Sequence, residues 1–382
     1  MAGTPSTIFA TMRIAVYIEN FLEKFPQNDK DLIIQIMNRL AELNPQLEFI
    51  FITAKSSKEI LVTEKNIKQI AVAPVTANTL IWKWWLNIRL PSLLKRYKAG
   101  VLICKTFCSL KIRIPQCLLI PDEIVVNKPQ LKPRHKTFFK NYMPKSLQQA
   151  RSILCFSNIA RNELSKQFSI HANDIKLFPP AVEGIFRPLS DIERNKIKEN
   201  LTNGHEFFVC HAEFQRHKDL IELLKAFSVF KKMQQSNMKL VLTGKFESYK
   251  KFKEDLKTYK YREAVLIKDT VSKEDLAPLL GAAYAFILLS QYNPFTARLL
   301  QGMRSGIPVI AAENEIVEEF AGKEILYFKE GEPSDLAVKM MYLYKDEDMR
   351  KNLIEKAGLV VAPYSIDNSA KLLWQSIEDA LN

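Results

Sequence analysis

The chain has 382 residues, which is more than one hydrophobic core usually contains and suits two α/β domains. Hydrophobic residues make up 47% and there are only 11 glycines, so the composition is that of a globular protein and excludes a low-complexity chain. The formal net charge of +13 permits an anionic partner without selecting among a nucleotide diphosphate, a lipid head group and nucleic acid.

The chain shows no targeting or membrane-spanning signal. No apolar run is long enough to cross a bilayer, and the N-terminus lacks a basic segment followed by an apolar core and a small-residue cleavage site. We therefore expect a cytoplasmic protein. Residues 1–11 lack periodicity and precede an apolar run that begins at Met12, where we expect the native chain to start.

Strand-like and helix-like patterns alternate along the first half of the chain. Apolar runs predict strands at 13–18, 47–53, 100–104, 116–120, 152–156 and 175–178. Helical spacing appears at 31–43, 136–149 and 158–168.

The alternation restarts after Phe178-Pro179-Pro180, with a join near residues 179–200. Strands are predicted at 207–211, 239–243, 264–267, 285–289, 309–310 and 325–328, and helices at 218–235, 246–259, 273–283, 297–304 and from Ser334 and Asp346. Two successive series of this kind predict an α/β protein with two Rossmann-like domains that face each other across a cleft. The predicted domains are 12–180 and 181–364.

Five cysteines lie in or beside apolar runs, and this suits buried, reduced thiols better than disulfides. They are Cys104, Cys108, Cys117, Cys155 and Cys210. No cysteine or histidine has a partner at zinc-like spacing, so no metal site is predicted.

The segment from Ala285 to Ile310 is the most informative stretch of the chain. It reads as a buried strand, a polar loop at 290–294, a helix at 297–304 and a second strand after Gly306 and Pro308. Loops that leave the carboxyl ends of parallel strands bind ligands, and helix N-termini attract phosphate. The segment therefore predicts a ligand site.

This segment resembles the donor-binding signature of retaining GT-B glycosyltransferases of family 4. The positions that match are Ser290, Phe295, Met303, Gly306, Pro308 and Val309. Asn293 and Gln301 stand where the family has two glutamates, and Thr296 stands where it has a glycine. The fold signature is retained while the chemical signature is altered.

Further segments resemble the same family in the same order. They are residues 119–170, the interdomain segment 182–186, the strand and helix at 211–227, and the strand at 239–245, which contains Gly244. The resemblance also implies that the last helix, within residues 365–382, packs back on the N-terminal domain.

The family holds the donor diphosphate with an arginine and a lysine. The lysine position is Lys218, whereas Glu213 occupies the arginine position, and Arg216 is a candidate to take over part of its role. For Lys218 the alternative is a solvated lysine at a helix start.

Three other family positions are also altered. The histidine of a His-Asp pair corresponds to Pro121, although Asp122 is retained. The glycine-rich loop after the first strand is replaced by residues 26–29, and a further Asp-Gly pair by Lys105-Thr106. Side chains in place of glycine should narrow the space for a ligand.

The resemblance implies a donor substrate, a nucleotide diphosphate sugar, with no cofactor and no metal. The catalytic positions are Asn293, Gln301 and Asp122, and the donor-binding positions are Arg216, Lys218, Gly244, Phe295 and Thr296. Amides hydrogen-bond hydroxyls but lack the negative charge that stabilises a developing sugar cation. Two interpretations remain open: a retaining glycosyltransferase of reduced activity, and an inactive GT-B scaffold or binding protein.

Residues 80–98 combine Trp82, Trp84 and Trp85 with five lysines and arginines. A basic helix with interfacial tryptophans is typical of peripheral membrane contact, and the alternative is that the tryptophans belong to a core. Nucleic acid is not expected as a partner, because aromatic and basic residues are not interleaved as in a single-strand binding surface.

Overall fold

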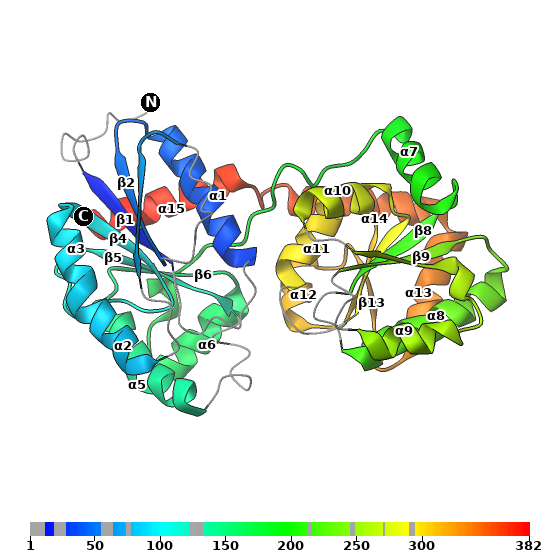
Figure 1. Cartoon of the computed structure of the whole chain (residues 1–382), viewed down its shortest axis with the longest axis horizontal. Coiled ribbons are helices and arrows are strands. Elements are labelled where there is room, and N and C mark those ends of the chain that lie inside the picture. The colour runs from blue at the N-terminus through cyan, green and yellow to red at the C-terminus, as the bar shows by residue number, and fades with distance from the viewer. Residues whose placement is uncertain are drawn as a thin grey trace. The chain divides into compact units, whose positions relative to one another are not determined.

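The computed structural model describes residues 12–18, 28–54, 64–73, 78–122, 125, 133–212, 216–244, 249–269, 272–289 and 295–382. The chain forms two compact units (Figure 1). The first unit contains Met1–Ala181 and Ile366–Asn382, and the second contains Val182–Ser365.

The first unit is built on a parallel sheet of seven strands in the order β3-β2-β1-β4-β5-β6-β7. The strands are β1 (Arg13–Tyr17), β2 (Glu48–Ala54), β3 (Ile67–Ala73), β4 (Ala99–Lys105), β5 (Gln116–Ile120), β6 (Ser152–Cys155) and β7 (Ile175–Leu177). Side chains alternate between the two faces: Ile14 and Val16 of β1 lie in one core cluster, and Ala15 and Tyr17 lie in the other.

Helices cover both faces of this sheet. One face carries α1 (Asn28–Leu43) and α15 (Ile366–Leu381), whose Leu373 and Ile377 are completely buried against the strands. The other face carries α2 (Thr79–Trp84), the π-helical turn η2 (Trp85–Arg89), α3 (Leu90–Arg96), α5 (Pro133–Gln149) and α6 (Asn158–Phe168). A short 3-10 turn, η4 (Ala172–Asp174), precedes β7. The C-terminal helix is thus part of the first unit.

The second unit is built on a parallel sheet of six strands in the order β10-β9-β8-β11-β12-β13. The strands are β8 (Phe207–His211), β9 (Lys239–Gly244), β10 (Val265–Asp269), β11 (Ala285–Leu288), β12 (Val309–Ala312) and β13 (Leu326–Phe328).

Helices again cover both faces of the second sheet. The helices are α7 (Asp191–Thr202), α8 (His217–Gln234), α9 (Lys250–Lys257), η6 (Arg262–Ala264), α10 (Lys273–Ala282), α11 (Phe295–Arg304), α12 (Glu315–Ala321), α13 (Pro333–Lys345) and α14 (Glu347–Val361). Helices α8, α9 and α13 contribute to one core cluster, and α10, α11, α12 and α14 contribute to the other. Among the described residues no helix is both long and apolar enough to span a membrane.

The predicted pair of Rossmann-like α/β domains is confirmed, but strand β3 and helices α7 and α12 were not predicted. Strand β3 is a partly exposed edge strand whose isoleucines and valine are interrupted by Lys68 and Gln69, so its apolar signal is weak. Helix α7 lies in the segment that was interpreted only as a join. Its signal was present, because Ser190 and Glu193 form a capping box.

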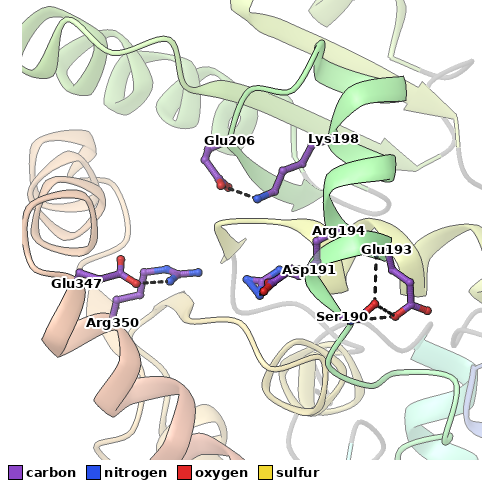
Figure 2. A network of polar contacts seen from close by, with 8 residues as sticks. All are labelled: Ser190, Asp191, Glu193, Arg194, Lys198, Glu206, Glu347 and Arg350. Atoms are coloured by element: carbon purple, nitrogen blue, oxygen red, sulfur yellow. Dashed lines mark hydrogen bonds and ion pairs between the residues drawn. The ribbon is translucent and has the colours of Figure 1, made fainter.

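Ion pairs lie around α7 and α14 in the second unit (Figure 2). Lys198, which is only 8% exposed, lies 2.5 Å from Glu206, the residue just before β8. The Arg350 guanidinium lies 3.0 Å from Glu347 in its own helix and 4.5 Å from the ring centroid of Tyr284. These contacts neutralise cations that the fold buries.

Helix α11 packs unusually close to the sheet at Gly302. A Cβ atom added there would lie 2.6 Å from the Phe286 ring of β11 and 3.1 Å from Val309 of β12. By contrast, a Cβ atom at Gly358 in α14 would meet nothing within 4 Å. Glycine is therefore required at the first position and not at the second.

We expect Gly302→Ala to lower the free energy of unfolding by about 1–3 kcal/mol, because the added methyl group overpacks a buried contact. The matched control Gly358→Ala should instead raise it by about 0.5–1 kcal/mol, since alanine reduces the freedom of the unfolded chain. Urea unfolding followed by circular dichroism measures both. Equal effects of the two substitutions would contradict the close approach of α11 to the sheet.

Candidate functional site

The strand order of the second sheet contains a topological switch point between β8 and β11. From β8 the chain continues to β9 and β10 on one side, and from β11 it continues to β12 and β13 on the other. The connections after these two neighbouring strands therefore diverge from one edge of the sheet. An opening of this kind is where parallel α/β sheets bind ligands.

Lys218 lies in the first turn of α8, directly after β8. Its side chain is 73% exposed, and Nζ lies 3.4 Å from a Glu222 carboxylate oxygen in the same helix. An exposed pair of this type contributes little stability. The ammonium group can therefore leave Glu222 for a phosphate group at small cost.

Arg216 is held more tightly than its neighbour. Its guanidinium donates to both carboxylate oxygens of Asp219, at 2.9 and 2.8 Å, and also to Glu330 at 2.5 Å. The hydrogen bonds that Arg216 donates to Asp219 and then to Glu330 raise the pKa of Arg216 further above its ordinary value. A diphosphate would have to compete with two carboxylates for this cation. Sequence reasoning missed Glu330, which follows β13 and has no local motif.

Gln301 is buried in α11, 6% exposed, and its side chain is already engaged. The Gln301 Oε1 atom accepts a hydrogen bond of 2.9 Å from Nη1 of Arg298, one turn earlier. Thr296 is half-buried in the first turn of the same helix. Phe295 begins the helix, whereas Ser290 and Asn293 lie outside the described residues, as does Glu213.

Two further polar residues lie at the same edge of the second sheet. His211 ends β8 and Thr243 lies near the end of β9, and His211 Nδ1 lies 2.9 Å from Thr243 Oγ1. Gly244 follows with a φ of 136°, which favours glycine. His217, at the start of α8, lies 2.7 Å from Asp255. No sequence motif pointed to these histidine contacts, because their partners lie 32 and 38 residues away.

The first sheet has its own switch point between β1 and β4. The replaced glycine-rich loop leaves β1; its residues 26 and 27 lie outside the described residues, and Asn28 and Asp29 begin α1. The connection after β4 contains Thr106, which is buried and has a φ of 72°. A β-branched residue rarely adopts this left-handed conformation. Thr106 thus has the left-handed backbone conformation that glycine adopts readily, although its own side chain disfavours that conformation.

Asp122 lies beyond the carboxyl end of β5 and is 7% exposed. Its Oδ1 atom accepts a hydrogen bond of 3.1 Å from the backbone N–H of Phe156, which follows β6. This carboxylate therefore ties two neighbouring strand ends together, and Pro121 precedes it. The contact accounts for Asp122 structurally whether or not the residue also acts on a ligand.

The cysteines are all buried and free, as predicted. Sγ of Cys104 lies 3.6 Å from Sγ of Cys108, and burial raises the pKa of the Cys104 thiol well above its ordinary value. Among the residues that the structure describes, no group of three histidine, cysteine or acidic residues is arranged to hold a metal ion.

Of the two interpretations left open for the three tryptophans, the core position is confirmed for two of them, so these two make no membrane contact. Trp82 is 1% exposed and Trp85 is 3% exposed, and both belong to the core beneath α2 and η2. Trp82 packs edge-on to Phe107 and Phe138. The large apolar surface of Trp82 and Trp85 favours their burial in the core. Trp84, in contrast, is 53% exposed.

A pair of substitutions at Thr106 isolates the cost of its backbone conformation. Thr106→Gly and Thr106→Ala both remove the Oγ1 and Cγ2 atoms, but only glycine adopts a φ of 72° without strain. We expect Thr106→Gly to be the more stable of the two by about 1 kcal/mol in denaturant unfolding. A higher stability for Thr106→Ala would show that the loop is not strained.

Residues 191–379 match the family Glycosyl transferases group 1. Among individual proteins, the chain is 23% identical over 225 residues to alpha-1,3/1,6-mannosyltransferase ALG2 of Saccharomyces cerevisiae. That match covers 51% of this chain and 45% of the relative, so the chain spans about half the length of that protein.

Solved structures extend the similarity to almost the whole chain. A glycosyltransferase from Rickettsia africae superposes with a TM-score of 0.74 and 16% identity, covering 97% of this chain and 98% of the other. Anabaena HepE in complex with UDP and glucose superposes with a TM-score of 0.72 and 13% identity, covering 96% and 99%. The chain therefore has the GT-B glycosyltransferase fold, and the match over residues 191–379 supports membership of glycosyl transferases group 1.

Proposed function

We propose that this protein is a glycosyltransferase that moves a sugar from a nucleotide diphosphate donor to a hydroxyl, with retention of the anomeric configuration. The second unit takes the donor and the first unit takes the acceptor. The observation that carries this proposal is the common edge of β8 and β11, from which both α8 with Lys218 and α11 with Gln301 begin. The UDP found with Anabaena HepE supports a nucleotide diphosphate as the donor.

Lys218 is the proposed diphosphate contact. It combines an exposed ammonium group with the first turn of an 18-residue helix, where the backbone N–H groups also favour an anion. Gly244, at the end of the adjacent β9, leaves room for the nucleotide because it has no side chain.

Gln301 and Asn293 are the proposed contacts to hydroxyl groups of the donor. Both amides accept hydrogen bonds, but neither supplies negative charge beside the developing oxocarbenium-like sugar. Loss of one preorganised electrostatic contact in other enzymes costs about a hundredfold to a thousandfold in rate. We therefore propose slow transfer.

A second candidate is a GT-B scaffold that binds without transfer. The specific observation in its favour is that both Asp219 and Glu330 already bind the guanidinium of Arg216. In the described part of α8's first turn, this leaves Lys218 as the one cation that is readily available to a diphosphate. Pro121 adds to this, because it supplies no donor at the position of the family's histidine. Donor binding and donor turnover distinguish the two candidates.

Lys218→Ala should weaken binding of UDP or GDP by about 1–3 kcal/mol, because a charge-assisted hydrogen bond is lost and a phosphate oxygen is left unpaired. Isothermal titration calorimetry measures the change. Raised salt should weaken the parent complex more than the variant complex, since an exposed cation–phosphate attraction is screened.

Lys225→Ala is the matched control for this experiment. Lys225 is exposed on the same helix, α8, two turns further from the switch point. The Lys225→Ala variant should bind nucleotide as tightly as the parent does. If Lys218→Ala also binds like the parent, Lys218 is a solvated helix-start residue and the donor-site assignment loses its main support.

Restoring both carboxylates should raise the rate of transfer or donor hydrolysis. We expect the double variant Asn293→Glu with Gln301→Glu to gain at least about tenfold, because it places negative charge near the sugar cation. Arg298, whose Nη1 lies 2.9 Å from Gln301 Oε1, should pair with the carboxylate introduced at position 301 and offset its burial.

The control is Asn293→Gln, which has the same side-chain lengths as the double variant without its charges. Release of nucleotide from UDP-sugars and GDP-sugars is the measurement. A folded double variant that binds nucleotide and yet is no faster than Asn293→Gln would favour the scaffold.

A further inference from the structure

The positive charge of this chain is concentrated in one part of the first unit. Residues 65–162 contain eighteen lysines and arginines and only two acidic residues, Asp122 and Glu123, a formal charge of +16. The whole chain carries +13, so the remaining residues sum to −3. Asp122 is buried, and the formal charge of this segment is almost entirely cationic.

The same segment exposes a stripe of large apolar side chains. They are Leu80 (76% exposed), Ile81 (47%), Trp84 (53%) and Ile88 (60%), all within α2 and η2. Leu80, Trp84 and Ile88 are spaced by four residues, which places them along one side of the helix. We call these four residues the apolar stripe.

The opposite side of this helix already contains a complete core face. Trp82, Trp85 and Leu86 are at most 3% exposed and pack toward the first sheet. A helix that is apolar on both sides is normally buried. The apolar stripe is therefore surplus to the packing of the first unit and is the kind of exposed patch that marks an interaction surface.

Cations surround the apolar stripe. Lys83 and Arg89 are exposed on the same helical segment, and Lys95 and Arg96 follow in α3. Helix α5 lies beside this segment on the same face of the sheet, where the Asn87 amide donates to the Tyr142 hydroxyl at 2.7 Å (Figure 1). Its exposed lysines are Lys136, Lys140 and Lys145.

We propose that the apolar stripe and the cations around it dock the protein onto an anionic lipid bilayer. Trp84 and its apolar neighbours enter the interface between head groups and acyl chains, and the lysines and arginines pair with anionic head groups. This surface differs from the predicted tryptophan contact, because Trp82 and Trp85 remain in the core. The proposal does not depend on glycosyl transfer and holds equally for the scaffold candidate.

The pairing of charge with apolar side chains favours a bilayer over the other anionic partners. Nucleic acid would be bound by cations and stacked aromatic rings, but the stripe contains three aliphatic residues and one tryptophan. An acidic protein partner would use the same charges, so the experiment separates it from lipid by using vesicles alone. Each cation close to an anionic membrane is worth about a fivefold gain in affinity.

The test is cosedimentation of the full chain with vesicles of phosphatidylcholine alone and of phosphatidylcholine mixed with phosphatidylglycerol. We expect binding to the mixed vesicles that weakens with salt, and at least about tenfold weaker binding to the neutral ones. Trp84→Ser with Ile88→Ser should lose at least about tenfold in affinity, as should Lys83→Glu with Arg89→Glu.

Matched controls come from the second unit. Ile192 and Leu359 are 82% and 73% exposed there, and Ile192→Ser with Leu359→Ser should bind mixed vesicles as the parent does. Tryptophan emission should shift to the blue on binding, and Trp84→Phe should keep the binding while losing most of the shift, since Trp82 and Trp85 are already buried. Two results would overturn the proposal and leave an acidic protein as the partner. One is retained vesicle binding in both the Trp84→Ser, Ile88→Ser variant and the Lys83→Glu, Arg89→Glu variant, and the other is no binding of the parent to mixed vesicles.

Discussion

Parallel strand pairing is the constraint on which the candidate sites depend. Every pairing within the described strands of both sheets is parallel, so all carboxyl ends of a sheet meet at one edge. Each strand order then reverses once, between β1 and β4 in the first unit and between β8 and β11 in the second. At these two points the connections diverge, so the strand order alone, whatever the side chains, sets the place where parallel α/β sheets bind ligands.

The fold was largely predictable because its signals are local. Buried parallel strands read as apolar runs, and the stop at Gly306 and Pro308 ends α11 where the pattern indicates. The site was less predictable, because its contacts are distant in sequence. Glu330 reaches Arg216 from 114 residues away, and nothing near Arg216 in the sequence indicates that a second carboxylate already holds it. Trp82 and Trp85 were ambiguous for a different reason: their helix is apolar on two sides, and spacing cannot say which side faces the sheet.

Electrostatics at the second switch point distinguishes binding from catalysis. Binding a diphosphate needs cations, and Lys218 is available at low cost because its pair with Glu222 is exposed. Stabilising a sugar cation needs anions, and Gln301 offers a neutral carbonyl that Arg298 already engages. The described part of this site therefore fits the charge of the proposed donor better than the charge of the transition state. Catalysis requires the reverse preference.

The uneven charge of the chain adds a kinetic consequence to this arrangement. The proposed nucleotide-sugar donor is anionic and would be attracted by residues 65–162 of the first unit, with +16, and not by the remainder, with −3. Such attraction would compete with Lys218 for the donor if these cations stayed exposed to solvent. The proposed docking on an anionic bilayer would neutralise them and leave Lys218 as an exposed cation at the switch point of the second unit. The proposed membrane surface and the proposed donor site are thus compatible uses of one charge distribution, because they lie on different units.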